Sequence, residues 1–398
     1  MRLSRSDSSR LAQWWFTVDH VLLTAVFLLI GIGIVLSLAA SPAVALKKGF
    51  STYYFVERHV VFAALAGAAL VVVSFLSPTG VRRLAAMLFM AAVAAMIFVF
   101  ISGQEINGAR RWLSVGGFAL QPSEFAKPSF VVLMAWLFSE AAQRKDVPAL
   151  PLAVFLWVLF VALLVVQPDV GQTVLISTTA GAMYLLAGLP LIGALIMLAL
   201  GGVGLTLAYF NFAHVQSRVD RFFNPMPLEN FQSDRAIQSF SEGGLFGRGP
   251  GEGMIKSVLP DAHTDYIFAV VAEEYGVIAC LVLLGIFAFI VLRALMRAAQ
   301  EPNPAVRLAI QGLAVVFGVQ ALINMAVNVG LLPPKGMTLP FISAGGSSML
   351  AIAITTGMLI ALTRRRPDIQ RLKKPRLMQS IGQVKLGTAD IEGQTETP

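Results

Sequence analysis

Residues 259–274 read LPDAHTDYIFAVVAEE and lead directly into an apolar run that ends near residue 292. The stretch holds five ionisable side chains in sixteen residues, among them His263 and Asp265. An apolar run of this length is typical of a membrane-spanning helix. Ionisable groups at a membrane boundary are costly to bury and usually face a cavity. We therefore expect a helical membrane protein whose chemistry takes place near Asp265.

The composition of the whole chain agrees with this interpretation. Of the 398 residues, 57% are hydrophobic and 13% are charged, whereas soluble proteins carry about 25% charged residues. The apolar runs have the length of helices and lack the ten-residue alternation of an outer-membrane barrel. The sequence predicts one all-α polytopic membrane domain.

Ten apolar runs come near the length of about 20 residues that a bilayer requires. They lie at about 18–40, 59–77, 84–102, 124–141, 150–167, 170–188, 190–212, 266–292, 307–330 and 347–363. An even number of spans places both ends of the chain on one side of the membrane. With both ends inside, cytoplasmic segments hold 18 of the 30 Lys and Arg residues and outer loops hold 11. The excess predicts cytoplasmic termini.

This topology divides the chain into three parts. Residues 1–17 form a cytoplasmic tail, residues 18–363 form the membrane domain, and residues 364–398 form a basic, weakly structured cytoplasmic tail. The largest extracytoplasmic loop covers residues 213–265, between the seventh and eighth spans. The basic tail suits anionic lipid, and the net charge of +8 is better explained by topology than by nucleic acid.

Asp265 follows His263 and Thr264 at the start of a span. Desolvation there would raise the pKa of its carboxyl group toward the range of a general base. The alternative is a helix N-cap, for which Asp is favoured. Glu273 lies two turns deeper, where it acts either as a cavity acid or as a paired structural acid.

Two further polar segments are candidates for a cavity. Glu124 and Lys127 are three residues apart on one predicted helix, so they suit either a buried functional pair or a helix-packing pair. Asp169 follows a proline between two spans, where it either lines a cavity or caps the next helix.

Outer loops supply the remaining candidates. Arg110, Arg111 and Trp112 suit an anionic headgroup, or else anchor the loop at the membrane interface. The segment PPKGMTLPFISAGGSS contributes Lys335, Ser343 and Ser347, which either line a cavity or belong to a re-entrant turn. No HExxH or Cys/His array is present, so we expect no cofactor and no recognisable metal site, although a divalent cation could still take part.

Six motifs in this order resemble the SEDS family of membrane glycosyltransferases, and their wording is closer to the division member than to the elongation member. The motifs are NGARRWL, QPSEFAK, QPDVGQ, FFNP, LPDAHTDYIFAVVAEE and LPPKGMTLPFISAGGSS. The resemblance implies that Asp265 is the essential acid, with Arg110, Trp112, Glu124, Lys127 and Asp169 around the cavity. The chain departs from the family pattern at Ser257, where an acid is usual, and at Tyr266 and Ala344.

The resemblance also implies a function and partners. We expect polymerisation of lipid II at the outer face of the bacterial inner membrane, at the division septum. The expected partners are a class B penicillin-binding transpeptidase and other membrane proteins of the division machinery. Two alternatives remain open from the residues alone: a lipid II flippase, suggested by the intramembrane charges, and a scaffold of the division complex that docks through its C-terminal tail.

Overall fold

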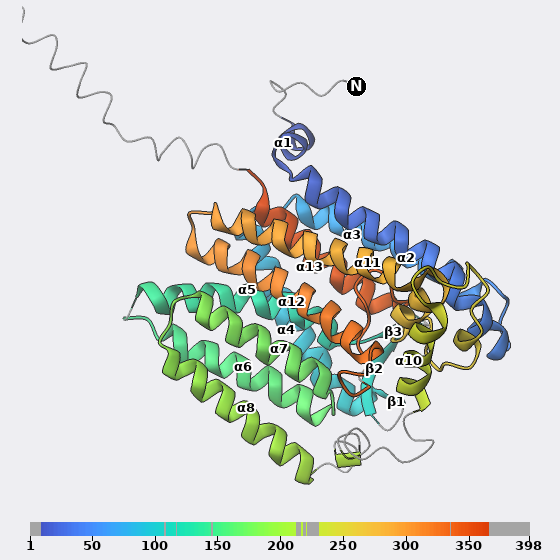
Figure 1. Ribbon diagram of the computed structural model, residues 1–398. Coiled ribbons are helices and arrows are strands. Elements are labelled where there is room, and N and C mark those ends of the chain that lie inside the picture. Colours follow the sequence, from blue (N-terminus) through green and yellow to red (C-terminus); the bar gives the residue numbers. More distant parts are fainter. Residues whose placement is uncertain are drawn as a thin grey trace, which may run out of the picture. The chain divides into compact units, whose positions relative to one another are not determined.

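The computed structural model describes residues 9–106, 109–116, 118–144, 146–211, 216–217, 220, 231–334 and 336–365. Within these ranges the chain is almost entirely helical (Figure 1). The elements are α1 (Arg10–Thr17), α2 (His20–Lys47), α3 (Tyr54–Ser74), α4 (Pro78–Ser102), β1 (Gln104–Ile106), β2 (Ala109–Val115), β3 (Phe118–Leu120), α5 (Pro122–Gln143), α6 (Ala149–Val166), α7 (Val170–Leu186), α8 (Leu191–Asn211), α10 (Phe231–Gly243), the 3-10 helix η1 (Ile255–Ser257), α11 (Ile267–Ala299), α12 (Pro304–Asn328) and α13 (Gly346–Thr363).

The predicted all-α polytopic class is confirmed. In the part of the chain that the structure describes, nine helices are long and apolar enough to cross a membrane: α2, α3, α4, α5, α6, α8, α11, α12 and α13. The apolar helix α7 is shorter, at 17 residues. Each of the ten predicted apolar runs therefore corresponds to a helix.

The chain divides into two compact units. The first comprises Met1–Val18 and Arg364–Pro398, and its described part includes α1, whose N-terminus is capped by the Ser9 hydroxyl. Within this unit Arg364 Nε donates to Thr17 Oγ1 at 2.9 Å. The backbone N–H of Arg365 also donates to the Thr17 carbonyl at 2.9 Å. The predicted tail beyond residue 365 lies outside the described residues.

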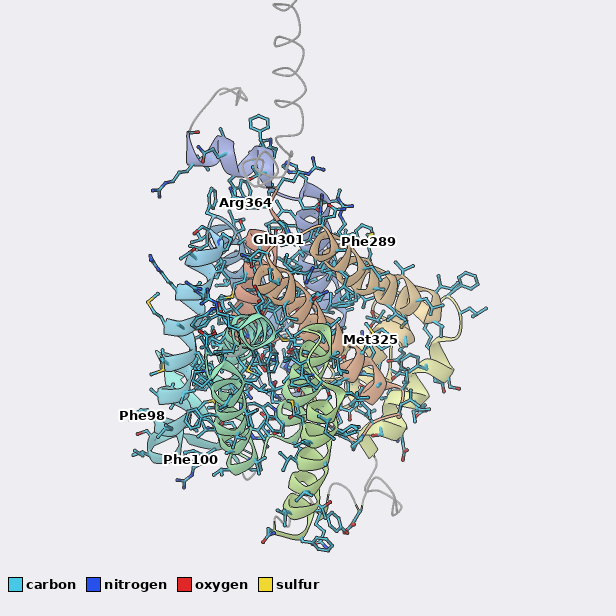
Figure 2. The ribbon with its side chains drawn as sticks, turned by 90° about the vertical axis from the view of Figure 1, so that its left-hand side faces the viewer. Phe98, Phe100, Phe289, Glu301, Met325 and Arg364 are labelled. Carbon is cyan, nitrogen blue, oxygen red and sulfur yellow. The ribbon has the colours of Figure 1, made fainter. Side chains whose placement is uncertain are left out.

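The second unit, Asp19–Thr363, contains the membrane helices. Its core is formed by α5, α12 and α13, which are the most buried of the candidate spans. Helix α13 packs against α3 and α12, and α12 also packs against α5, α7 and α11. Large apolar side chains such as Phe98 and Phe289 instead project outward from the peripheral helices (Figure 2). An apolar exterior of this kind suits a lipid environment.

The segment between α4 and α5 contains a small antiparallel sheet that the sequence analysis did not predict. Its strand order is β1-β2-β3, with Glu105 opposite Arg110 and Leu113 opposite Leu120. Figure 1 shows the strands and α10 toward the same end of the helices. The register shifts at Arg111, because Arg110 and Trp112 lie opposite the consecutive residues Glu105 and Gln104.

Helix α11 is interrupted near its start. Gly276 has φ 80° and ψ 176°, which breaks the helix after its first turns. A Cβ atom at this position would lie 2.3 Å from the carbonyl oxygen of Leu245. Only glycine combines this left-handed backbone with such a close approach. The break separates a short segment next to Asp265 from the long membrane-spanning part of α11.

Candidate functional site

The segment 261–266, just before α11, is held against the loop that precedes α13. The carbonyl oxygen of His263 accepts a hydrogen bond from the backbone N–H of Ala344 at 2.9 Å. The next carbonyl, of Thr264, accepts one from the Ser343 hydroxyl at 2.5 Å. Two segments about 80 residues apart in sequence are thus fixed to each other by consecutive backbone groups.

Two asparagines on α12 hold the backbone of Asp265 itself. Asn324 Nδ2 donates to the Asp265 carbonyl at 2.8 Å and to the Met337 carbonyl at 2.7 Å. Asn328 Nδ2 donates to the same Asp265 carbonyl at 2.9 Å, and its Oδ1 accepts from Ala269 N–H at 3.0 Å. The backbone position of Asp265 is therefore set by α12 and not by local structure alone.

The side chain of Asp265 has no partner among the residues that the structure describes. No hydrogen bond or ion pair to its carboxylate is found among the described residues, although the group is only half-exposed at most. A Cβ atom on Gly336 would lie 3.5 Å from Oδ2, so the opposite loop comes close. Burial, reinforced by the charge of Asp261, raises the pKa of Asp265 to about 7. The N-cap of α11 is Tyr266, so capping does not explain Asp265.

A cavity of about 210 Å³ opens beside this segment, between α3 and the start of α13. Its walls are formed by Phe55, Arg58, His59, Phe62, His263, Ala344, Gly345, Gly346 and Met349. The His263 ring lies on that of Phe55, with the centroids 4.7 Å apart. Burial, together with the charge of Lys48, lowers the pKa of His263 to about 4. His263 is therefore a neutral imidazole at pH 7.

A larger groove of about 520 Å³ runs between α2 and α11, lined by residues such as Leu28 and Phe289. Its lining is almost wholly apolar, with His20 as its one titratable side chain, whereas the smaller cavity has Arg58, His59 and His263. Chemistry on a polar substrate needs titratable groups near the reacting atoms. The smaller cavity next to the Asp265 segment is therefore the better candidate site.

Glu124 and Lys127 form a buried ion pair on α5, with Nζ 2.8 Å from Oε2. Lys127 also donates to Gln320 Oε1 on α12 at 2.8 Å, and Gln172 on α7 donates to Glu124 Oε1 at 2.5 Å. The pair thus ties three helices together. Gln320 Nε2 in turn donates to the carbonyl of Thr338 at 3.1 Å, which links the pair to the loop facing Asp265.

Asp169 belongs to a second buried cluster. Its Oδ1 accepts from Gln172 N–H at 3.3 Å, which caps α7. Its Oδ2 accepts from Gln121 Nε2 at 3.1 Å and lies 3.9 Å from Arg111 Nη1. Arg111 also donates to the carbonyls of Gln167 and Pro168. The guanidinium of Arg111 is therefore largely committed to this turn.

The remaining predicted residues are dispersed. Arg110 is exposed and Trp112 is partly buried on the small sheet. Ser347 is buried in the first turn of α13. Lys335 lies outside the described residues.

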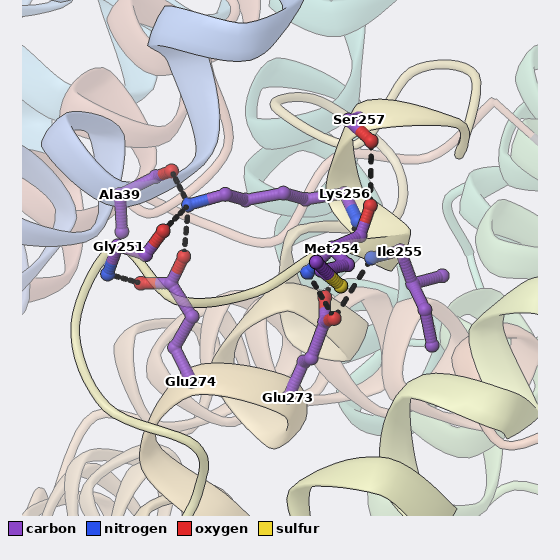
Figure 3. A network of polar contacts seen from close by, with 8 residues as sticks. All are labelled: Ala39, Gly251, Met254, Ile255, Lys256, Ser257, Glu273 and Glu274. Carbon is purple, nitrogen blue, oxygen red and sulfur yellow. Dashed lines mark hydrogen bonds and ion pairs between the residues drawn. The ribbon is translucent and has the colours of Figure 1, made fainter.

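Glu273 takes part in a different network (Figure 3). Its carboxylate accepts from the backbone N–H groups of Met254, Ile255 and Lys256 at 2.6, 2.8 and 3.2 Å. The neighbouring Glu274 pairs with Lys256 Nζ and accepts from Gly251 N–H at 3.0 Å. Both acids are satisfied by the segment 251–256, as the paired structural alternative requires.

Sequence reasoning missed the amides that hold the site. Gln320, Asn324 and Asn328 recur every four residues, which places them on one face of α12. Three buried amides at this spacing inside an apolar helix are a signal that the sequence does contain. His59 was also missed, and it has no comparable signal.

No group of three or more His, Cys, Asp or Glu side chains that could hold a metal ion is found within the described ranges.

Comparison with known proteins adds the family context. A family model that covers FtsW, RodA and SpoVE, described as "Cell cycle protein", matches residues 19–367. The chain is 47% identical over 368 residues to a protein of Caulobacter vibrioides named probable peptidoglycan glycosyltransferase FtsW, covering 92% of this chain and 94% of that one. A protein of the same name from Saccharophagus degradans is 34% identical, covering 89% and 94%.

Solved structures show the same fold. A chain from a study of structural coordination of polymerization and crosslinking by a peptidoglycan synthase complex matches with a TM-score of 0.72 and 28% identity, covering 88% of this chain and 98% of that one. The rod shape determining protein RodA of Thermus thermophilus matches with a TM-score of 0.64 and 26% identity, covering 88% and 97%.

Proposed function

Because the chain belongs to the cell cycle protein family of FtsW, RodA and SpoVE, the SEDS family, we propose that it is a peptidoglycan glycosyltransferase. It polymerises lipid II into glycan strands during septal cell-wall synthesis. The reaction takes place at the outer face of the bacterial cytoplasmic membrane, at the division septum, with both termini in the cytoplasm. The observation that carries the proposal is the Asp265 carboxylate, which pairs with no described residue, is fixed through its own backbone, and has a pKa raised to about 7.

In the proposed reaction a sugar hydroxyl of one lipid-linked disaccharide attacks the anomeric carbon of the growing chain. A glycosidic C–O bond forms, and the bond to the polyprenyl diphosphate breaks with its electron pair left on the diphosphate oxygen. Asp265 accepts the hydroxyl proton, for which a pKa near the working pH is favourable. Direct attack inverts the configuration at the anomeric carbon.

The other polar clusters hold together the helices around this site. Arg111 and Lys127 are committed to Asp169 and Glu124. Such closed pairs are better suited to holding helices together than to carrying a charged group across the membrane. They therefore favour the enzyme over the flippase. The tail on which the scaffold alternative depends begins at the edge of the described residues.

We further propose a class B penicillin-binding transpeptidase as the partner, together with other membrane proteins of the division machinery. Support comes from the solved chain with a TM-score of 0.72, which belongs to a peptidoglycan synthase complex that coordinates polymerization and crosslinking. The basic C-terminal tail contacts anionic lipid, and nucleic acid is not a partner. No cofactor is proposed, and the effect of EDTA on polymerisation measures the contribution of any divalent cation.

The proposal is tested with purified lipid II in liposomes. Wild type and Asp265→Asn are each co-purified with the cognate transpeptidase, whose own crosslinking is blocked. We expect polymer from the wild type and a loss of at least about 1000-fold from the variant, since the base is removed while its shape is kept. Equal polymer from both proteins would contradict the role of Asp265. Movement of lipid II across the liposome without polymer would favour the flippase.

A further inference from the structure

Two buried histidines face the cavity beside the Asp265 segment without hydrogen-bond partners. His59 is 3% exposed, and neither of its ring nitrogens has a partner among the residues described. His263 is 5% exposed, and its Nδ1 is likewise unpaired. Both line the cavity. Because an unpaired buried polar group costs about 1–3 kcal/mol, two of them around one cavity indicate a ligand that they bind.

The cavity also carries positive charge, which the charge of Asp261 opposes at His263. Arg58 lines it, donates to the Tyr54 hydroxyl at 3.0 Å, and lies over the Phe118 ring at 5.8 Å from the centroid. No carboxylate within the described ranges forms an ion pair with Arg58, and no acid is found in the lining. Lys48 lies over the Phe55 ring at 5.6 Å, close enough for its charge to act on His263. The ligand is therefore expected to be an anion.

The N-terminus of α13 forms a third side of the cavity. The first backbone hydrogen bond at this end of α13 runs from Met349 N–H to the Gly345 carbonyl at 2.9 Å. The N–H groups of residues 346–348 precede it and have no acceptor within the helix. A Cβ atom on Gly346 would lie 2.5 Å from the Phe62 ring, so glycine lets the backbone approach the cavity wall. Free N–H groups at a positive helix end favour phosphate.

We propose that this cavity binds the phosphoryl groups of the lipid-linked diphosphate. The inference rests on the proposed glycosyltransferase function and deepens it. Arg58, His59, His263 and the first N–H groups of α13 are the donors, and Lys48 adds charge at the rim. A volume of about 210 Å³ equals that of about seven waters at ~30 Å³ each, which accommodates two phosphoryl groups.

The same site explains how the leaving group is stabilised. When the anomeric C–O bond breaks, the electron pair and its charge remain on the diphosphate. Fixed donors aimed at the place where charge develops lower the barrier most effectively. Arg111 and Lys127 already pair with carboxylates, whereas Arg58 has no such partner among the described residues. Asp265 and Arg58 thus act on opposite ends of the reaction, as base and as binder of the leaving group.

The test measures binding without turnover. The full chain carrying Asp265→Asn is placed in nanodiscs of phosphatidylcholine, and the Kd of polyprenyl diphosphate is compared with that of polyprenyl alcohol. Arg58→Gln and Lys48→Gln are added in turn to this background. Arg82→Gln is the matched control, because Arg82 lies on α4 against the Trp136 ring and not at the cavity. Phosphatidylglycerol and inorganic pyrophosphate are tested as competitors.

We expect Arg58→Gln to raise the Kd of the diphosphate about tenfold and Lys48→Gln about threefold, with the alcohol and the Arg82→Gln control unchanged. Unchanged diphosphate binding in both cavity variants would overturn the proposal. So would competition by phosphatidylglycerol as strong as that by the diphosphate, since the site would then take ordinary lipid headgroups. If Arg58→Gln does not fold, Lys48→Gln decides, because it alters an exposed side chain.

This result is separate from the test of the proposed function. Binding is measured on a chain that does not turn over, so a failure to detect polymer from the wild type leaves the diphosphate measurement intact. Conversely, polymer from the wild type with unaltered binding in both cavity variants would retain the enzyme and reject this site.

Discussion

Asp265 and Glu274 are nine residues apart in one stretch of the sequence, yet the fold treats them in opposite ways. Glu274 is 1% exposed and is neutralised by Lys256 within the network of Figure 3. Asp265 lies two residues after His263, which lines the cavity, and no described residue pairs with its carboxylate. The comparison teaches that burial of an acid does not by itself indicate function. What separates the two is whether the protein supplies a partner or leaves that place to a ligand.

The largest expected effect is a loss of folding stability when the partner of Glu274 is removed. Lys256→Met removes the cation from the buried carboxylate of Glu274 and should lower the free energy of unfolding by about 3 kcal/mol. Thermal unfolding of the full chain in detergent measures it. Arg248→Met is the matched control, because its ion pair with Glu242 is exposed and should contribute at most about 0.5 kcal/mol.

Asp265→Asn should instead raise the free energy of unfolding at pH 8. The raised pKa of Asp265 means that the folded chain binds this proton more tightly than the unfolded chain does. Stability is therefore lost as the pH rises toward about 7, and an uncharged Asn avoids that loss. Equal destabilisation by Asp265→Asn and Lys256→Met would remove the distinction between the two acids.

The next effect concerns the pH dependence of the polymerisation rate. As a general base Asp265 is active when deprotonated, so the rate should be half-maximal near pH 7, where its pKa lies, and fall about tenfold per unit below that. Asp261→Asn removes the charge that adds to the raised pKa and should shift the midpoint downward. Asn also tolerates the positive φ of 54° at this position. Rate profiles with lipid II well below its KM decide it, because kcat/KM reports the pKa of the free enzyme, and a midpoint that rises in the variant would contradict the assignment.

A smaller effect tests how the backbone of Asp265 is held in place. Asn324→Ala removes both hydrogen bonds that join Asp265 to the opposite loop. We expect kcat to fall about tenfold with little change in KM, because the base is displaced from its position. Asn303→Ala is the control on the same helix, since it removes the N-cap of α12 at about 1 kcal/mol without touching the site. A larger effect on KM than on kcat would instead place Asn324 in substrate binding.

Hydropathy was enough to predict the long apolar helices, because membrane spans are set by long apolar runs, but it did not predict α1 or α10. The position of Asp265 was also evident, as a polar cluster at the start of one run. The partners of the buried side chains were not evident, because they are brought together only by the tertiary structure. Lys256 Nζ, for example, donates to the Ala39 carbonyl, which is 217 residues away in sequence. For the same reason Arg58 and His59 drew no attention. Each is unremarkable in sequence, and only the fold brings it to the cavity with His263.

The smallest expected effect compares two hydroxyl groups. Ser257 stands where the family usually has an acid, yet it is exposed and donates only to the Met254 carbonyl at 2.6 Å. Ser257→Ala should change stability by no more than about 0.5 kcal/mol and leave polymerisation unaltered. Ser343→Ala deletes the same atom but frees the Thr264 carbonyl next to Asp265, so we expect about a threefold lower rate. Ser343 Oγ also accepts from Leu339 N–H at 2.8 Å within its own loop, so a lower rate in Ser343→Ala alone shows that the contacts of this loop with the Asp265 segment support the reaction.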